Sequence, residues 1–104
     1  MKLRLQVSVF GMIAVACAGM ASAETIRQAC LLSDRGVGQV RLCHCLQGAA
    51  DRTLSRQDQR LAARFFRDPD YAQKLRRSDR RKDEAFWERY ETFGERAEKS
   101  CSKS

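Results

Sequence analysis

Apolar residues recur at intervals of three and four along most of the chain beyond residue 36, which is the spacing of one face of an α-helix. No run alternates between apolar and polar residues for long enough to indicate a sheet. The first clear helix is predicted from about 37 to 51, and its cysteines, Cys43 and Cys45, lie about 200° apart around the axis. They therefore suit bonds to two different elements. The expected buried stripe of this helix is Leu42, Cys45, Leu46, Ala49 and Ala50.

Two further helices are predicted on either side of the only proline. Ser55 is a good N-cap, and Asp58 adds negative charge near the positive end of the helix dipole, as in a capping box with Asp in place of Glu. This helix should stop at Asp68, because the residue before a proline avoids helical geometry. Asp68 then caps a short third helix with Pro69 at its first position. The inward residues are expected to be Leu61, Ala62, Phe65 and Phe66 in the second helix and Tyr71, Ala72 and Leu75 in the third.

A long last helix is predicted after Ser78 or Asp79, either of which would cap it. Its apolar seam leads to Cys101, so the last cysteine should lie on the buried side. Gly94 interrupts this helix at a cost of about 1 kcal/mol relative to alanine, and a close approach by another helix would explain it. Residues 24–35 are ambiguous between a short helix and an irregular lead-in. The seam consists of Phe86, Tyr90, Phe93 and Ala97.

The first 23 residues have the pattern of a secretory signal peptide. Two basic residues precede an apolar stretch, and the segment ends in the small residues 21–23. The stretch is shorter than the roughly 20 apolar residues of a spanning helix, so cleavage after Ala23 is favoured over a membrane anchor. A lipid anchor at Cys17 is a minor alternative, because alanine replaces the leucine that usually precedes such a cysteine by three residues. Cleavage leaves residues 24–104 as one small domain of 81 residues, predicted to be periplasmic or secreted.

Four cysteines remain in that domain, and an even number in a short exported chain indicates a disulfide framework. A Cys43–Cys45 bond would close a strained small ring. Two pairings stay open: Cys30–Cys43 with Cys45–Cys101, and Cys30–Cys45 with Cys43–Cys101. Two thiolates beside His44 also suggest a copper or zinc site or a redox pair. This alternative is weaker, because zinc motifs separate paired cysteines by two to four residues and exported cysteines are usually oxidised. We therefore expect a partly exposed histidine and no metal or other cofactor.

Positive charge is concentrated in residues 74–82, where six of nine residues are basic. The formal net charge is +7 for the whole chain and +5 for residues 24–104, because residues 1–23 hold two basic residues and no acidic one. A solvated helix junction would account for this basic run, and the alternative is a surface that binds an anion. A periplasmic partner would then be a lipid headgroup, an anionic polymer or an acidic protein, whereas nucleic acid would require another compartment. The candidate residues are Lys74, Arg76, Arg77, Arg80, Arg81 and Lys82.

Trp87 is the only tryptophan, and it lies about 100° from Phe86 around the predicted last helix. Packing in the core is favoured, and a place at the rim of a binding site, beside arginines, is the alternative. The chain has one histidine and no readable serine–histidine–carboxylate pattern, phosphate-binding loop, dinucleotide fingerprint or EF-hand. An enzyme is therefore not expected, and no catalytic residue is predicted.

Two stretches resemble a family of small exported proteobacterial proteins that are often labelled arginine transporters or left uncharacterised. The stretches are "LCHCLQGAADRTLSRQDQRLAARFFRDPD", residues 42–70, and "SDRRKDEAFWERYETFGERAEKSC", residues 78–101, which together make up 53 of the 81 residues from 24 to 104. This resemblance implies at most an accessory role in the uptake of arginine or another basic amino acid. No spanning segment follows residue 23, and a cationic ligand would need an acidic pocket, whereas the concentrated charge is basic.

The sequence therefore predicts a small all-α, four-helix, disulfide-stapled domain that follows a signal peptide and acts as a binding or interaction module. The accessory role in basic amino-acid transport is the first alternative. A thiol redox or copper-handling role for Cys43-His44-Cys45 is the second.

Overall fold

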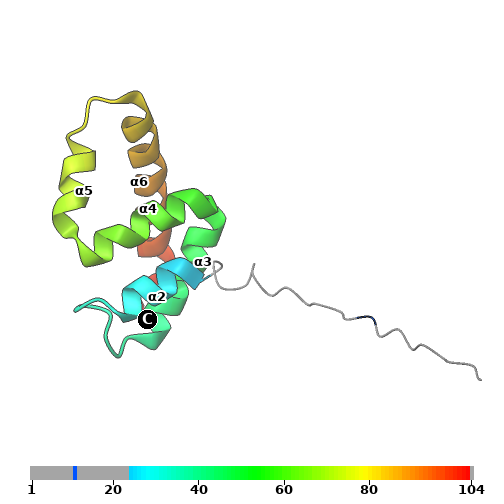
Figure 1. Ribbon diagram of the computed structural model, residues 1–104. Coiled ribbons are helices and arrows are strands. Elements are labelled where there is room, and N and C mark those ends of the chain that lie inside the picture. Colours follow the sequence, from blue (N-terminus) through cyan, green and yellow to red (C-terminus); the bar gives the residue numbers. More distant parts are fainter. Residues whose placement is uncertain (1–10, 12–23, 104) are drawn as a thin grey trace, which may run out of the picture.

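The computed structural model describes residue 11 and residues 24–103 of the 104-residue chain. The rest of the predicted signal peptide, including Cys17, lies outside the described residues. Five helices and no strand occupy the described part of the chain, which confirms the prediction of a small all-α fold (Figure 1). Four helices were predicted, and the fifth forms within residues 24–35, the segment that the sequence left ambiguous. The helices are α2 (Thr25–Leu31), α3 (Val40–Thr53), α4 (Arg56–Arg67), α5 (Pro69–Arg76) and α6 (Arg81–Cys101).

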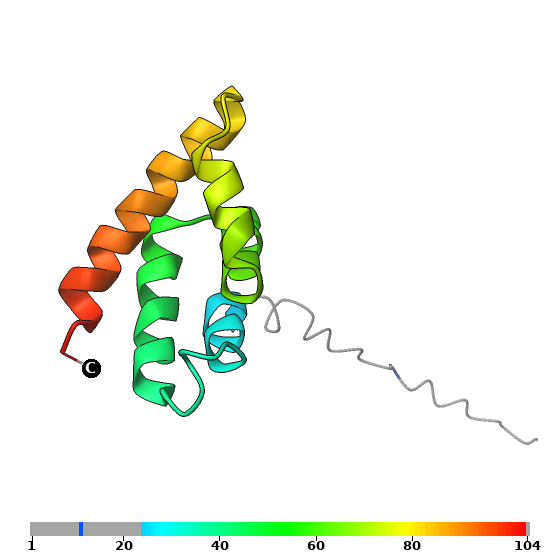
Figure 2. The same ribbon diagram turned by 90° about the vertical axis from the view of Figure 1, so that its left-hand side faces the viewer.

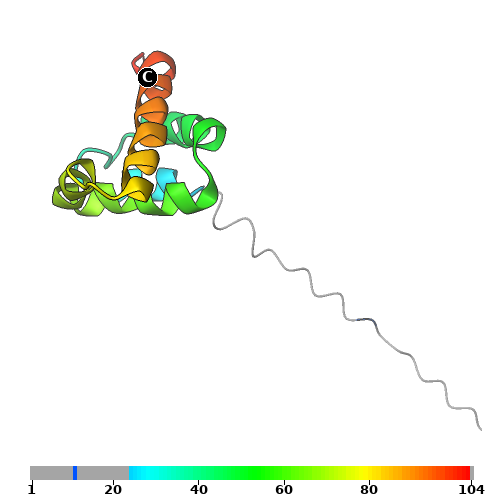
Figure 3. The ribbon, with the colours of Figure 1, turned by 90° about the horizontal axis from the view of Figure 1, so that it is seen from above.

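Helix α3 packs against two other helices, with α2 on one side and α6 on another. Figure 2 shows α6 running beside α3, with its C-terminal end near the first half of that helix. Helix α4 packs on α2 and continues into α5, which in turn packs on the beginning of α6. Figure 3 shows α4 crossing α6 at a steep angle. Helix α6 therefore contacts α3 through its later turns and α5 through its earlier ones.

The start and the buried stripe of α3 differ from the prediction. The helix begins at Val40 rather than near residue 37, because Gly38 adopts a positive φ of 79° that a helix does not accommodate. Cys43 is completely buried and Gln47 is buried as well, whereas Cys45 is only partly buried, as are Leu42 and Leu46. The physical reason is that α2 and α6 cover different sides of α3, so this helix buries two faces rather than one stripe.

A buried polar network joins α2, α3 and α4. The side-chain amide of Gln47 donates hydrogen bonds to Asp51 Oδ1 at 2.8 Å and to Gln59 Oε1 at 2.9 Å. The side-chain oxygen of Gln47 accepts from the backbone N–H of Arg27 at 2.9 Å. Gln47 thereby satisfies a free donor at the start of α2, whose N-cap residue Glu24 makes no side-chain cap. Buried amides that are satisfied in this way favour one arrangement of the three helices over others.

The predicted caps of α4 and α5 are confirmed. The hydroxyl of Ser55 accepts from the backbone N–H of Asp58 at 3.0 Å. The carboxylate of Asp68 accepts from the backbone N–H of Tyr71 at 3.3 Å, and proline occupies the first turn of α5. These local signals start two helices where the sequence indicates, with α5 spanning eight residues rather than about nine.

The predicted cap of α6 is wrong. The helix begins at Arg81, and its N-cap residue is Arg80, which makes no side-chain cap. Ser78 instead accepts from the backbone N–H of Arg80 at 3.2 Å and donates to the carboxylate of Asp83 at 2.6 Å. Ser78 therefore lies two residues before the N-cap residue and links the turn before α6 to the first turn of the helix.

The hydrophobic core is centred on Phe65 of α4. Its ring centroid lies 5.1 Å from that of Tyr90 and 5.9 Å from that of Phe86, both edge-on. Ile26 from α2 is completely buried in the same cluster. The predicted seam of α6 is confirmed, because Phe86, Phe93 and Ala97 are buried and Tyr90 is partly buried. Cys101, to which the seam leads, is buried as well.

Two glycines test this packing with effects of opposite sign. Gly94 is exposed, and a Cβ atom there would meet nothing within 4 Å, so the close helix approach expected from the sequence is not found. Gly94→Ala is expected to raise the free energy of unfolding by about 1 kcal/mol, because alanine is the better helix former. Gly36→Ala should lower it, because a Cβ there would overlap the backbone carbonyl of Cys30. Urea denaturation measures both changes. A neutral result for Gly36→Ala would contradict the close approach of residue 36 to Cys30, and a destabilised Gly94→Ala would contradict the open surroundings of Gly94.

Candidate functional site: a basic surface on α4, α5 and α6

The two cysteines of Cys43-His44-Cys45 bond to different helices. Cys43 pairs with Cys30 of α2, and Cys45 pairs with Cys101 at the end of α6, with Cα–Cα distances of 5.5 and 5.8 Å. This is the first of the two pairings that the sequence left open. His44 between them is exposed. Among residues 24–103 no group of three or more His, Cys, Asp or Glu side chains is arranged to hold a metal ion. In the disulfide-bonded form neither sulfur is a thiolate that could bind a metal ion.

The six candidate anion-binding residues of the basic run, residues 74–82, are all exposed where α5 joins α6, at the top of Figure 1. None of them forms an ion pair with another residue in the described part of the chain. Lys74, Arg80 and Lys82 line a cleft of about 370 Å³ between α5 and α6. The other three, which are Arg76, Arg77 and Arg81, do not line it. The structure thus brings half of the run together around one cleft.

A larger basic cleft, of about 570 Å³, lies between α4 and α6, and the sequence analysis missed it. We call it the arginine groove. Its cationic residues are Arg60, Arg64, Arg67, Lys82 and Arg89. The three from α4 are spaced by four and three residues, which places them on one face of that helix. This spacing of the arginines is the signal in the sequence that identifies the basic face of α4, opposite in character to its apolar face. Because Lys82 belongs to both, the groove adjoins the basic run.

Two guanidinium groups of the arginine groove are held in place by neighbouring side chains. The Cζ atom of Arg64 lies 3.7 Å from the ring centroid of Tyr71, a cation–π contact. Arg89 donates two hydrogen bonds to the buried carboxylate of Asp58, from Nε at 2.6 Å and from Nη2 at 3.1 Å. The hydrogen bond with Asp58 raises the pKa of Arg89 above its ordinary value. The groove therefore contains preoriented cations rather than freely moving ones.

The charge of the arginine groove is positive, because five cations face two carboxylates. One of these, Asp58, is occupied by Arg89, and the other, Asp83, accepts the hydroxyl of Ser78 at 2.6 Å. In residues 24–103 Arg60, Arg64 and Arg67 form no ion pair. An anion that enters the groove therefore meets three guanidinium groups that are not paired with a carboxylate. Hydrogen bonds between such groups and an anion are charge-assisted and strong.

Trp87 packs among aromatic side chains and lines neither of these clefts. Its ring centroid lies 5.1 Å from that of Tyr90 and 6.2 Å from that of Phe65. The side chain is partly buried against the core. This placement favours packing over a position at the rim of the basic surface.

Comparison with protein-family models, curated proteins and solved structures finds no match for this chain. None of the helices in the described residues is long and apolar enough to cross a membrane.

The Arg89–Asp58 pair is expected to contribute about 1 kcal/mol to stability, because half-exposed pairs are weakened by solvent. The side chain of Arg89 is 49% exposed and that of Asp58 is 11% exposed. A double-mutant cycle of Arg89→Gln and Asp58→Asn, measured by urea denaturation, should give a coupling energy of that size. As a control, Arg96→Gln and Asp58→Asn should be additive, since Arg96 is exposed and has no described ion pair. A coupling energy near zero for the first pair would contradict the arrangement of the groove.

Proposed function

We propose that this protein is a small helical binding module that holds an anionic partner on the surface formed by the arginine groove and the basic run. The groove is the observation that carries the proposal. It gathers five cations from two helices, keeps two of them oriented through Tyr71 and Asp58, and leaves its α4 arginines without competing carboxylates. Orientation before binding lowers the entropic cost of ordering these long side chains.

The spacing of the cations suits a partner with several anionic groups. Arg60 and Arg67 are seven positions apart on α4, as are Lys82 and Arg89 on α6, so each pair spans about 10 Å along its helix axis. Two such rows face one cleft. A single small anion would engage only one or two of these groups. A row of lipid headgroups or an acidic protein segment would engage both rows, which is why we favour a partner of that kind.

An envelope location fits the cysteines. Both described disulfides tie helices together, and such bonds are typical of proteins in oxidising compartments. Together with the signal-peptide pattern of residues 1–23, this supports export, with the partner in the periplasm or outside the cell. We propose a binding role without catalysis, because the groove gathers cations and both of its carboxylates already accept hydrogen bonds, Asp58 from Arg89 and Asp83 from Ser78.

The two alternative functions have less support from the described surface. A cationic ligand such as arginine would be repelled by the groove, where five cations outnumber two carboxylates. A thiol redox or copper-handling role would require Cys30–Cys43 and Cys45–Cys101 to be reduced first. The resemblance to proteins labelled arginine transporters remains the only support for the former.

The protein without residues 1–23 is expected to bind anionic partners in a salt-dependent way. We expect co-sedimentation with phosphatidylglycerol vesicles or calorimetric binding of a decaglutamate peptide at low salt, and no binding to phosphatidylcholine vesicles. Binding should weaken steeply between roughly 0.1 M and 1 M salt, as the screening length falls from about 10 Å to about 3 Å. If neither anionic probe binds at low salt, the proposed function is wrong.

Two charge-matched triple variants locate the surface. Arg60→Gln, Arg64→Gln and Arg67→Gln together should abolish binding, because they empty the α4 wall of the groove. Arg76→Gln, Arg77→Gln and Arg81→Gln remove the same charge from positions that line neither cleft, and should weaken binding only several-fold. Equal losses in the two variants would show that net charge, rather than the groove, holds the partner.

A further inference from the structure

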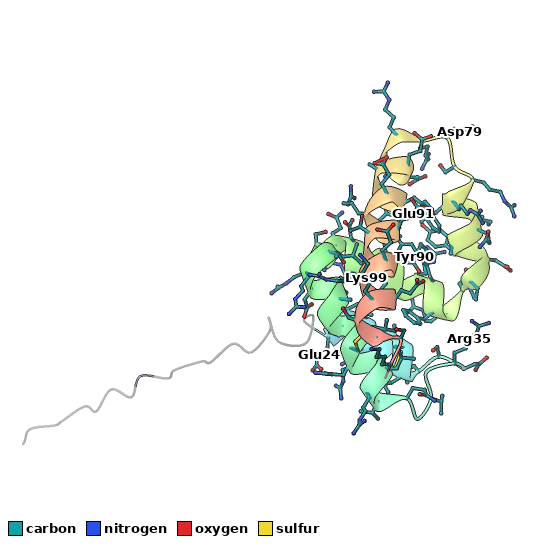
Figure 4. The ribbon with its side chains drawn as sticks, turned by 180° about the vertical axis from the view of Figure 1, so that it is seen from behind. Glu24, Arg35, Asp79, Tyr90, Glu91 and Lys99 are labelled. Carbon is teal, nitrogen blue, oxygen red and sulfur yellow. A yellow bond between two sulfur atoms is a disulfide. The ribbon has the colours of Figure 1, made fainter. Side chains whose placement is uncertain are left out.

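A third cleft, of about 460 Å³, lies between the α2–α3 connection, the corner of α4 and α5, and α6. It is built differently from the two basic clefts, because aromatic side chains form much of its lining. Figure 4 shows Arg35 on the connection and Tyr90 on α6, two of the residues that line it. The lining also includes Phe65, Phe66, Arg67 and Pro69 from the α4–α5 corner and Ser33 and Asp34 from the connection. We call it the aromatic cleft.

The floor of the aromatic cleft is an apolar surface formed by three aromatic side chains. Phe65 is 7% exposed, Phe66 is partly buried, and the ring of Tyr90 stands edge-on to Phe65 at 5.1 Å. Burial raises the pKa of Tyr90 above its ordinary value, so its phenol stays neutral and can donate a hydrogen bond. That hydroxyl has no hydrogen-bond partner among the residues that the structure describes. An apolar floor with few polar groups is the usual lining of a small-molecule site.

Two unpaired guanidinium groups flank this floor. Arg35 comes from the α2–α3 connection and Arg67 from the end of α4, so they belong to different walls. Neither forms an ion pair with another described residue. The one carboxylate in the lining is Asp34, which leaves the cleft with an excess of one positive charge. A carboxylate in the cleft would find two guanidinium groups without an ion pair in its lining, and a cation would be repelled by the net positive charge.

The wall that carries Arg35 is held in place by a disulfide. The connection lies between Cys30 and Cys43, which are bonded to each other. Within it the hydroxyl of Ser33 donates to the carbonyl of Cys30 at 2.7 Å and accepts from the backbone N–H of Gly36 at 3.2 Å. The cleft is therefore already formed without a ligand, which lowers the entropic cost of filling it.

We propose that the aromatic cleft binds a small aromatic monocarboxylate. The ring would lie against Phe65, Phe66 and Tyr90, and the carboxylate would face Arg35 and Arg67. The volume falls within the roughly 300–1,000 Å³ of small-molecule sites. This goes beyond the proposed function, because the cleft involves the α2–α3 connection and a small ligand rather than the arginine groove and an extended partner. Arg67 alone lines both.

Trp87 makes the proposal directly measurable. It is the only tryptophan of the chain, and its ring centroid lies 5.1 Å from that of Tyr90 and 6.2 Å from that of Phe65. Titration with phenylacetate is expected to change its fluorescence in a saturable way. The neutral analogue 2-phenylethanol should bind at least about tenfold more weakly, and acetate and phenethylamine should give no saturable change. Amide chemical shifts recorded in the same titration should move at Arg35, Gly36 and Arg67.

Single substitutions assign the ligand to this cleft. Arg35→Gln and Arg67→Gln should each raise the Kd for phenylacetate about tenfold, and Asp34→Asn should lower it. Arg60→Gln is the matched control, because it removes the same charge from α4 but lines only the arginine groove, and it should leave the Kd unchanged. The proposal is overturned if neither fluorescence nor chemical shifts change saturably. Equal binding of phenylacetate and 2-phenylethanol, or equal effects of Arg35→Gln and Arg60→Gln, would also overturn it.

Discussion

The fold depends on two cysteines that lie two residues apart on α3 and bond to opposite parts of the chain. Cys43 is turned toward α2 and Cys45 toward the end of α6, so one short segment of α3 holds both ends of the described chain. Closing a loop of 56 residues with Cys45–Cys101 removes about 4 kcal/mol of chain entropy from the unfolded state, and the 13-residue loop of Cys30–Cys43 removes about 3 kcal/mol. A domain of this size has a small core, so contributions of this magnitude are a large part of its stability.

The positions of the two disulfides help to explain where the arginine groove and the aromatic cleft lie. Cys45–Cys101 holds the last turn of α6 on α3, whereas the first turns of α6 are positioned by α5, by the core residue Phe86 and by the pair between Arg89 and Asp58. The arginine groove lies along that second region, away from the disulfides. The aromatic cleft depends instead on Cys30–Cys43, which fixes the connection that supplies one of its walls. The two bonds thus set up two surfaces of different chemistry on one small scaffold.

Much of the helical structure could be predicted because its signals are local. Ser55 and Asp68 cap helices through bonds within three residues, and the seam of α6 follows from a repeat along one helix. Features that depend on a second element could not be predicted. The burial of Cys43 requires α2 beside α3, and the choice between two disulfide pairings requires the position of α6. The prediction of the α6 cap was wrong for a similar reason, because Ser78 donates its hydrogen bond to Asp83 across the turn.

For the candidate site, too, local features could be predicted from the sequence, and features that need two or more elements could not. The basic run was visible because its charges are consecutive, and the structure confirms that its residues are exposed. The arginine groove was missed because its members are spread from residue 60 to residue 89 and meet only when α4 packs near α6. The aromatic cleft combines three separate segments, and its arginines carry no sequence signal that distinguishes them from other exposed arginines.

Mapping the disulfides of the unreduced protein tests this account most directly. Trypsin should release residues 28–35, 42–52 and 100–103 as one cluster joined by two disulfides. Mass spectrometric fragmentation of the backbone between Cys43 and Cys45 then separates the two bonds. Our account predicts that the fragment with residues 42–43 carries residues 28–35, and that the remainder carries residues 100–103. A fragment of residues 42–43 bound to residues 100–103, or free thiols at these positions, would contradict it.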